Sequence, residues 1–174
     1  IAFQIINFRK KKILNTNDLI TIIKKIKKNK KKTKKNIATK SFQAIRIFVN
    51  EEVGELIQGL IEATRVLSPG AKLVVVSFHS LEDKIVKYFF RTYSEESKNP
   101  SRYFPAPKKE NLRLFDCPTK KPITPSQKEI LKNFSSRSAK VRYGIRNEKK
   151  YFFPKKLKEK FKDYLEIEKM SLDL

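Results

Sequence analysis

Glycine, cysteine and histidine are scarce in this 174-residue chain, and each scarcity excludes a class of site. The four glycines form no cluster, so no glycine-rich loop is present to hold a phosphate or a dinucleotide. The single cysteine, Cys117, excludes an internal disulfide framework and fits a reducing compartment, so we expect a cytoplasmic protein. One histidine and one cysteine are too few for a zinc site, and we expect no metal.

Long apolar runs are also missing from the sequence. No stretch approaches the roughly 18 apolar residues that cross a membrane, and we expect no membrane partner. The amino terminus has no signal-peptide pattern, because basic residues follow its short apolar run instead of preceding it. The chain begins at Ile1, already within a helical pattern and without a methionine, which predicts a fragment of a longer protein.

Acidic residues are few beside basic ones. The chain has 41 lysines and arginines against 18 acids, a net charge of +23. Such an excess favours a polyanionic partner, although a genome rich in A and T produces the same excess without any binding role. The densest block runs from Lys24 to Lys35, with nine lysines in twelve residues. It predicts a loop that either contacts an RNA backbone or is simply solvated.

Helical spacing dominates the first third of the chain. Ile1, Ile5 and Phe8 share one helical face, and Thr16 is the predicted N-cap of a second helix. An apolar stripe between Phe42 and Val49 marks a third helix. We expect Asn50 to cap a fourth, with acids in its first turn, which ends before the Pro-Gly turn at 69–70.

A buried strand follows this helix. The run "LVVV" before Ser77 is typical of a parallel central strand covered on both faces, and an amphipathic helix begins at about Leu81. Helix, turn, strand and helix make an α/β unit, whose site lies beyond the carboxyl end of the strand. Farther along, short strands are expected at Leu112–Cys117 and Ala139–Ile145, with a short helix between them that opens at Pro125 or Ser126. The tail from residue 147 is weakly amphipathic at best.

His79 and Ser80 occupy the predicted site, between strand and helix. A serine-histidine-acid triad is a poor interpretation, because adjacent side chains point in different directions and no glycines flank the serine. Ser80 instead resembles a helix N-cap, with Asp83 three residues later as in a capping box. The residue types alone therefore identify no catalytic group.

Four segments in order carry a resemblance to a known family: "ATKSFQAIRIFVNEEVGEL", "LSPGAKLVVVSFHSLEDKIVKYFF", "TKKPITPSQKEI" and "RSAKVRYGIR". Together they resemble the carboxyl half of the bacterial 16S ribosomal RNA (cytosine-N4)-methyltransferases, the MraW or small-subunit methyltransferase H family. The resemblance extends over about residues 1–146. Asn36-Ile37 and Lys40 stand where the family usually has His-Pro and arginine, which puts any role of that histidine in doubt here.

The resemblance implies a class I, Rossmann-like methyltransferase fold of the α/β class with an inserted helical domain. Residues 1–49 resemble part of the inserted domain, residues 50–146 the carboxyl-terminal part of the methyltransferase domain, and residues 147–174 form a basic tail. S-adenosyl-L-methionine is the implied methyl donor, and the implied acceptor is a cytidine N4 in the decoding centre of 16S rRNA, within the small ribosomal subunit. The cofactor-binding residues of the family precede Ile1, so none is assigned here and the chain alone is expected to be inactive.

We expect the substrate to meet the loop after the buried strand. Phe78 is predicted to stack on the target base or to pack in the core. His79 is predicted to hydrogen-bond or stack there, or else to fix the loop, with Ser80 beside it. Arg137 and Arg142 are candidate phosphate contacts, or members of an ordinary exposed strand face. A non-catalytic basic RNA-binding remnant is the alternative function, and the sequence leaves the oligomeric state open.

Overall fold

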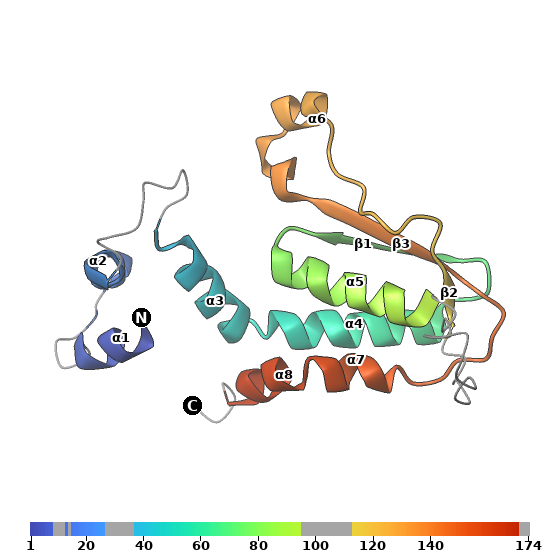
Figure 1. The fold of residues 1–174 in the computed structure, drawn as a ribbon, viewed down its shortest axis with the longest axis horizontal. Coiled ribbons are helices and arrows are strands. Elements are labelled where there is room, and N and C mark those ends of the chain that lie inside the picture. Colours follow the sequence, from blue (N-terminus) through green and yellow to red (C-terminus); the bar gives the residue numbers. More distant parts are fainter. Residues whose placement is uncertain (9–12, 14, 27–36, 95–112, 171–174) are drawn as a thin grey trace, which may run out of the picture. The chain divides into compact units, whose positions relative to one another are not determined.

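The computed structural model of the chain describes residues 1–8, 13, 15–26, 37–94 and 113–170 (Figure 1). It divides into two compact units, Ile1–Glu52 and Val53–Leu174. The predicted lysine-rich loop lies for the most part outside the described residues, because only Lys24, Lys25 and Ile26 of that block belong to an element.

The described part of the amino-terminal unit is helical, with α1 packed on α2. Ile22 and Ile23 of α2 are buried, as the predicted apolar spacing requires. The residues of the predicted Phe42–Val49 stripe also form a helix, which confirms that element. The helices of this unit are α1 (Ala2–Phe8), α2 (Thr16–Ile26) and α3 (Thr39–Val49).

Two predicted helix caps in this stretch are wrong. One cap lies one residue earlier than predicted, and the other residue ends a helix instead of starting one. Asn15, not Thr16, caps α2: its Oδ1 accepts from the N–H of Asp18 at 3.1 Å, and Asp18 Oδ2 accepts from the N–H of Asn15 at 3.3 Å. This is a reciprocal capping box. Asn50 is the C-cap of α3 instead of the N-cap of α4, and Glu51 after it has a positive φ of 50°.

Helix α4 (Glu52–Val66) runs into the carboxyl-terminal unit and buries one apolar stripe. A turn follows in which Pro69 and Gly70 are the central residues, Gly70 has φ of +83°, and the N–H of Ala71 donates to Ser68 O at 3.1 Å. Proline then glycine at these places is the pattern of a type II turn, where positive φ favours glycine. The turn feeds the chain directly into β1. The buried stripe consists of Val53, Ile57, Leu60, Ile61 and Thr64.

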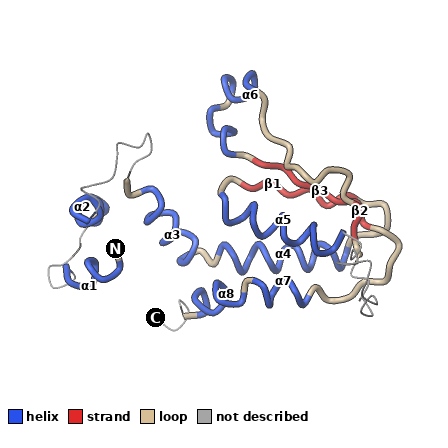
Figure 2. Tube along the Cα trace, viewed as in Figure 1, coloured by secondary structure: helices blue, strands red, loops and turns tan. Residues whose placement is uncertain are grey.

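The sheet has three strands in the order β1-β3-β2, and both pairings are antiparallel (Figure 2). Strand β1 pairs with β3 from Lys72 opposite Ile145 to Ser77 opposite Lys140. The two predicted strands after the site are thus confirmed, although β2 is shorter than expected. The strands are β1 (Lys72–Ser77), β2 (Phe115–Asp116) and β3 (Lys140–Arg146).

Strand β1 differs from its predicted environment. A parallel strand covered on both faces was expected, but its only partner among the described strands runs antiparallel. Side chains alternate between the faces of a strand, and here Val74 and Val76 on one face are 56% and 51% exposed while Ser77 on the other is buried. Within the described residues, one face and one edge of β1 therefore have no cover.

Helix α5 (Ser80–Ser94) covers the opposite face of the sheet and contacts all three strands (Figure 1). Its buried face centres on Phe89, which stacks edge-on against Phe90 and Phe115 at centroid distances of 5.3 and 5.5 Å. Gly144 of β3 makes room for this cluster, because a Cβ there would come within 2.8 Å of the Phe90 ring. One part of the core of this unit thus lies between α5 and the sheet.

A helical arm separates β2 from β3. It consists of α6 (Gln127–Lys132) and the 3-10 helix η1 (Phe134–Ser138). Ser126 caps α6 by accepting from the N–H of Glu129 at 3.2 Å, which confirms the predicted start of this helix. The arm leaves the sheet at the start of β3, beside the carboxyl end of β1 (Figure 1).

The carboxyl-terminal segment is more ordered than weak amphipathic character suggests. It forms α7 (Lys155–Lys160) and α8 (Lys162–Lys169), and α7 packs on α5 (Figure 1). Leu157 and Phe161 are fully buried, and the Phe161 ring meets Tyr88 of α5 edge-on at 5.6 Å. Helix α7 thus lies on the side of α5 that faces away from the sheet.

Candidate functional site: the edge after strand β1

The loop between β1 and α5 consists of Phe78 and His79, because β1 ends at Ser77 and α5 begins at Ser80. Ligands of open α/β sheets bind beyond the carboxyl ends of the strands, which is where this loop lies. The structure therefore places the predicted site residues 78–80 at the expected edge. Their roles in binding remain predictions.

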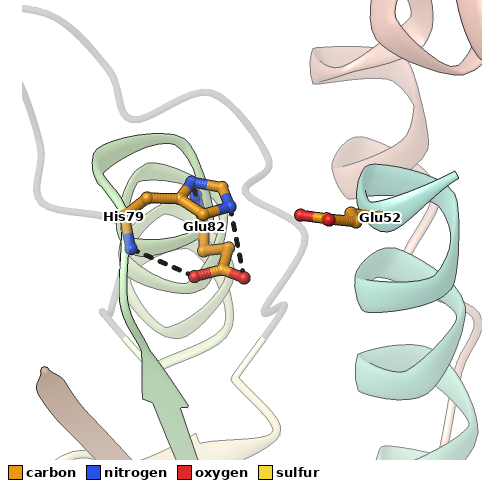
Figure 3. A group of neighbouring side chains, drawn as sticks. All are labelled: Glu52, His79 and Glu82. Atoms are coloured by element: carbon orange, nitrogen blue, oxygen red, sulfur yellow. Dashed lines mark hydrogen bonds and ion pairs between the residues drawn. The ribbon is translucent and has the colours of Figure 1, made fainter. Parts of the chain in front are cut away.

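His79 is the N-cap of α5, held in a reciprocal box with Glu82 (Figure 3). The N–H of Glu82 donates to Nδ1 of His79 at 3.3 Å, and Oε2 of Glu82 accepts from the N–H of His79 at 3.2 Å. The predicted cap was Ser80 with Asp83, so the box is displaced by one residue. Glu52, also drawn in Figure 3, belongs to the amino-terminal unit, where its carboxylate pairs with Arg46 at 2.7 Å.

This geometry fixes the tautomer of His79. Because Nδ1 accepts a hydrogen bond, the ring proton of the neutral imidazole is on Nε2. That atom lies 3.2 Å from Oε1 of Glu82, so the same carboxylate faces both the backbone and the ring. The side chain is only 11% exposed. Nδ1 of the imidazole is therefore occupied by the backbone of α5.

Phe78 lies beside this box with its ring exposed. Oε2 of Glu82 accepts from the Phe78 N–H at 2.8 Å, so the backbone is held while the side chain is 56% exposed. The alternative of core packing is not met among the described residues. An exposed aromatic ring on a fixed backbone at a sheet edge is suited to stacking on a base.

Arg142 is less available than its position on a strand suggested. Its Nε donates to Asp83 Oδ1 at 2.8 Å, and its Nη1 donates to the carbonyl of Lys120 at 3.1 Å. Lys140 Nζ reaches the other oxygen of Asp83 at 3.0 Å. Burial by itself raises the pKa of Asp83, but the hydrogen bonds and charges of Arg142 and Lys140 outweigh it and hold that pKa below its usual value. This cluster joins α5 to β3.

Arg137 lies in η1, three residues before β3, on the same edge of the sheet as Ser77. Its guanidinium is stacked over the Phe134 ring at 4.6 Å from the centroid. Phe134 is 68% exposed, so the pair offers both charge and an aromatic surface to solvent. The structure thus brings Arg137 to the edge that carries Phe78. Arg142 lies farther along β3, and its guanidinium is ion-paired with Asp83.

Sequence reasoning missed two parts of this edge. The first is the pairing of Glu82 with His79, whose three-residue separation is the capping-box spacing, but histidine is an uncommon cap residue. The second is the exposed Phe134, which only the fold brings near the β1 edge. The pairing of Asp83 with β3 has no local sequence signal, because it is a contact between distant segments, whereas the stacking of Arg137 on Phe134 joins residues three apart within η1.

A complete site for S-adenosyl-L-methionine is not formed by the described residues. Gly54 and Gly59 lie within α4, Gly70 is in the turn before β1, and Gly144 faces the Phe90 ring. None of them opens a loop that approaches a nucleoside cofactor closely.

Comparison with known proteins identifies the family. The sequence matches the MraW methylase family over residues 1–147, and the chain belongs to that family. A ribosomal RNA small subunit methyltransferase H from Methylorubrum extorquens (strain PA1) is 50% identical over 111 residues, covering 64% of this chain and 32% of that protein. The protein of the same description from Ehrlichia canis (strain Jake) is 44% identical over 146 residues, covering 82% of this chain and 45% of its own length.

A third relative described in the same words, from Hyphomonas neptunium (strain ATCC 15444), is 41% identical over 131 residues, covering 75% of this chain and 38% of that protein. The chain thus spans between about a third and just under half of the curated relatives it matches. The match to a methyltransferase family agrees with the mixed helix-and-sheet fold. Among the described residues, no helix combines the length and apolar composition needed to cross a membrane.

Proposed function

We propose that this chain is the carboxyl-terminal part of an rRNA methyltransferase that uses S-adenosyl-L-methionine to methylate the exocyclic N4 of a cytidine in the decoding centre of 16S rRNA. The family match over residues 1–147 carries this proposal. The relatives described above are named as methyltransferases of small-subunit ribosomal RNA, which supports RNA as the substrate. The net charge of +23 is suited to a polyanionic partner.

The fold we propose for the complete protein is a class I, Rossmann-like sheet with an inserted helical domain. Residues 1–49 belong to that inserted domain, and residues 50–146 complete the methyltransferase sheet. Support comes from β1, whose Val74 and Val76 are exposed although valine pairs of this kind are normally covered. An apolar edge strand without charged residues at its centre is an aggregation hazard, so it is suited to pairing with a further strand.

In this proposal the methyl donor binds to parts of the protein outside this chain. The residues of this chain form the wall of the pocket for the target base. Phe78 stacks on the base, the box of His79 and Glu82 fixes the loop that carries Phe78, and Ser80 begins the helix behind it. Methyl transfer needs amine and donor in line, so the contribution of these residues is positioning.

A basic RNA-binding module without chemistry is the second candidate. It rests on the charge alone and needs no methyl donor. The reading frame upstream of Ile1 separates the two: a strand followed by a glycine-rich loop supports the enzyme, and a stop codon supports the remnant.

The direct test uses the complete protein with small ribosomal subunits that lack the modification. After incubation with S-adenosyl-L-methionine, the 16S rRNA is digested and its nucleosides are separated by mass spectrometry. We expect N4-methylcytidine to appear in proportion to enzyme. Methylation of a different nucleoside would contradict the assignment of the acceptor, and no methylation at all would favour the binding module.

A further inference from the structure

A cavity of about 480 Å³ opens between the second half of α5 and the segment that follows β2. It is separate from the β1 edge, because its α5 residues begin at Lys87, eight residues and about 12 Å along the helix axis beyond His79. Its volume falls in the usual range for ligand sites. We call it the basic pocket. Its charged lining consists of Lys87, Arg91, Arg113, Asp116, Lys120 and Arg142.

The charges of this lining are unbalanced. Five of the six charged side chains are cations, and the single acid, Asp116, already pairs with Arg113 at 2.6 Å. Arg142 is paired with Asp83 beneath the cavity at 2.8 Å. The charges of Arg113 and Arg142 are therefore each balanced by a carboxylate.

Lys87 and Arg91 have no such compensation, since no carboxylate of the described residues forms an ion pair with either. They are four residues apart on α5 and both are exposed on the face that lines the cavity. Like charges at this spacing on a helix repel one another and destabilise it. An anion between the two side chains removes that repulsion.

The floor of the basic pocket is closely built. Phe90 and Cys117 lie against Gly144, where a Cβ would come within 2.8 Å of the ring and 3.1 Å of the sulfur. Burial raises the pKa of the Cys117 thiol, although a hydrogen bond with Ser94 acts in the opposite direction. Tyr143 adds a second aromatic side chain to the lining. Apolar and aromatic groups beneath a rim of cations match a nucleotide, which has a planar base and an anionic phosphate.

We propose that the basic pocket binds a phosphate-bearing ribonucleotide unit, with Lys87 and Arg91 on the phosphate oxygens. If the proposed function holds, this unit belongs to the RNA strand that flanks the target base, which places a phosphate anchor about two to three turns of α5 from the loop that carries Phe78. A free mononucleotide has the same chemistry, and the experiment separates the two sources.

The first measurement is RNA affinity of the 174-residue chain as a function of salt, with a labelled single-stranded RNA decamer. The test variant is Lys87→Glu with Arg91→Glu. The matched control is Lys84→Glu with Lys155→Glu, which makes the same charge change at exposed residues that do not line the cavity. We expect the test variant to bind about tenfold or more weakly at 100 mM salt and to lose about 1.4 units of salt slope, for two lost phosphate contacts on a single strand.

The second measurement reads the pocket itself. Cys117 is the only cysteine of the chain, so the rate of alkylation by iodoacetamide at pH 8.5 reports this one site. We expect RNA at saturation to slow alkylation at least fivefold in the parent and control chains, and to have no effect in the test variant. Adding cytidine monophosphate in place of RNA tests the second source: protection by both ligands indicates a mononucleotide site, and protection by RNA alone indicates a strand contact.

Two results overturn the proposal: equal loss of affinity in the test and control variants, or unchanged alkylation at saturating RNA and cytidine monophosphate. Circular dichroism melting shows whether the variants fold, and Lys87→Gln with Arg91→Gln replaces the test variant if charge reversal unfolds the chain. Neither measurement involves methyl transfer. A failure of the proposed enzyme activity is therefore distinguishable from a failure of this binding site.

Discussion

Oε1 of Glu168 accepts a hydrogen bond from the N–H of Val53 at 3.0 Å, although the two residues are 115 positions apart in the sequence. Oε2 of the same carboxylate accepts from the N–H of Gly54 at 2.8 Å. The first N–H groups of a helix have no partner within it, and a carboxylate at this end also faces the positive end of the helix dipole. Glu168 in α8, which follows the region of the family match, therefore caps α4, which lies within it.

Replacing Glu168 by alanine is expected to lower the free energy of unfolding by about 2 kcal/mol, because one buried and one partly buried N–H group lose a charged acceptor. Glutamine at this position keeps one acceptor oxygen and should lose about half as much. Urea denaturation monitored by circular dichroism measures both. Glu166→Ala is the control, since Glu166 is 54% exposed and pairs with Lys162 on the surface. Equal loss in the variants at 166 and 168 would show that the cap contributes nothing specific.

The ion pair between Asp83 and Arg142 gives a second prediction. Both side chains are largely buried, at 14% and 10% exposure. Asp83→Asn leaves the Arg142 guanidinium buried without its counter-charge, so we expect the free energy of unfolding to fall by about 3 kcal/mol at pH 7. Asp163→Asn, at an exposed position of α8, serves as the control and should change the free energy of unfolding by less than about 0.5 kcal/mol.

The same pair predicts a pH dependence. The pKa of Asp83 is lowered in the folded chain, so its contribution is present above the unfolded value of about 3.9 and is lost as the pH falls through the folded value. The stability difference between parent and Asp83→Asn should therefore shrink below about pH 4. A difference that stays constant from pH 7 to pH 2 would mean that the carboxylate is not stabilised by its partners.

His79 can be tested for structure and function separately. Alanine removes the acceptor for the Glu82 N–H and should cost about 1 kcal/mol of stability, whereas asparagine is a good N-cap and should restore most of it. In the complete protein we expect both variants to methylate more weakly while donor affinity is nearly intact. Full activity of His79→Asn would leave the histidine a purely structural role. Donor affinity that falls as far as activity would place it in the donor pocket instead.

Tyr93 makes the folded chain sensitive to alkali. Burial raises the pKa of this phenol to about 12, above its usual value of 10. The folded state therefore holds the proton that the unfolded state loses, and stability falls as the pH rises from about 10 to 12. Because lysines titrate in the same range, the readout is the difference from Tyr93→Phe, which keeps the ring. We expect the parent to lose more stability than the phenylalanine variant across this interval, and identical curves would contradict a buried phenol.

The elements near the site were predictable because their signals are local. The continuous apolar run before Ser77 indicates β1, the alternation after Ser138 indicates β3, and Pro69-Gly70 indicates the turn before β1. The loop that carries Phe78 and His79 follows from these elements. The proposed function came from the resemblance of the whole chain to a family, because no residue type in this loop indicates it.

The rest depended on contacts between distant residues. Burial of Leu157 and Phe161 is not evident from this lysine-rich segment, because one apolar residue at every fourth position, from Phe153 to Leu165, makes only a narrow helical stripe. The cap on α4 comes from a glutamate 115 residues away. The apolar run of β1 predicted a strand covered on both faces, and this was wrong for the described residues, since Val74 and Val76 are exposed.

The central claim is that this chain supplies the acceptor side of a methyltransferase whose donor site lies in other parts of the protein. The most direct test supplies purified 174-residue chain and, separately, the complete protein with radiolabelled S-adenosyl-L-methionine and unmodified small ribosomal subunits. We predict label in 16S rRNA with the complete protein and none above background with the chain alone. Saturable donor binding and methyl transfer by the isolated chain would contradict the claim.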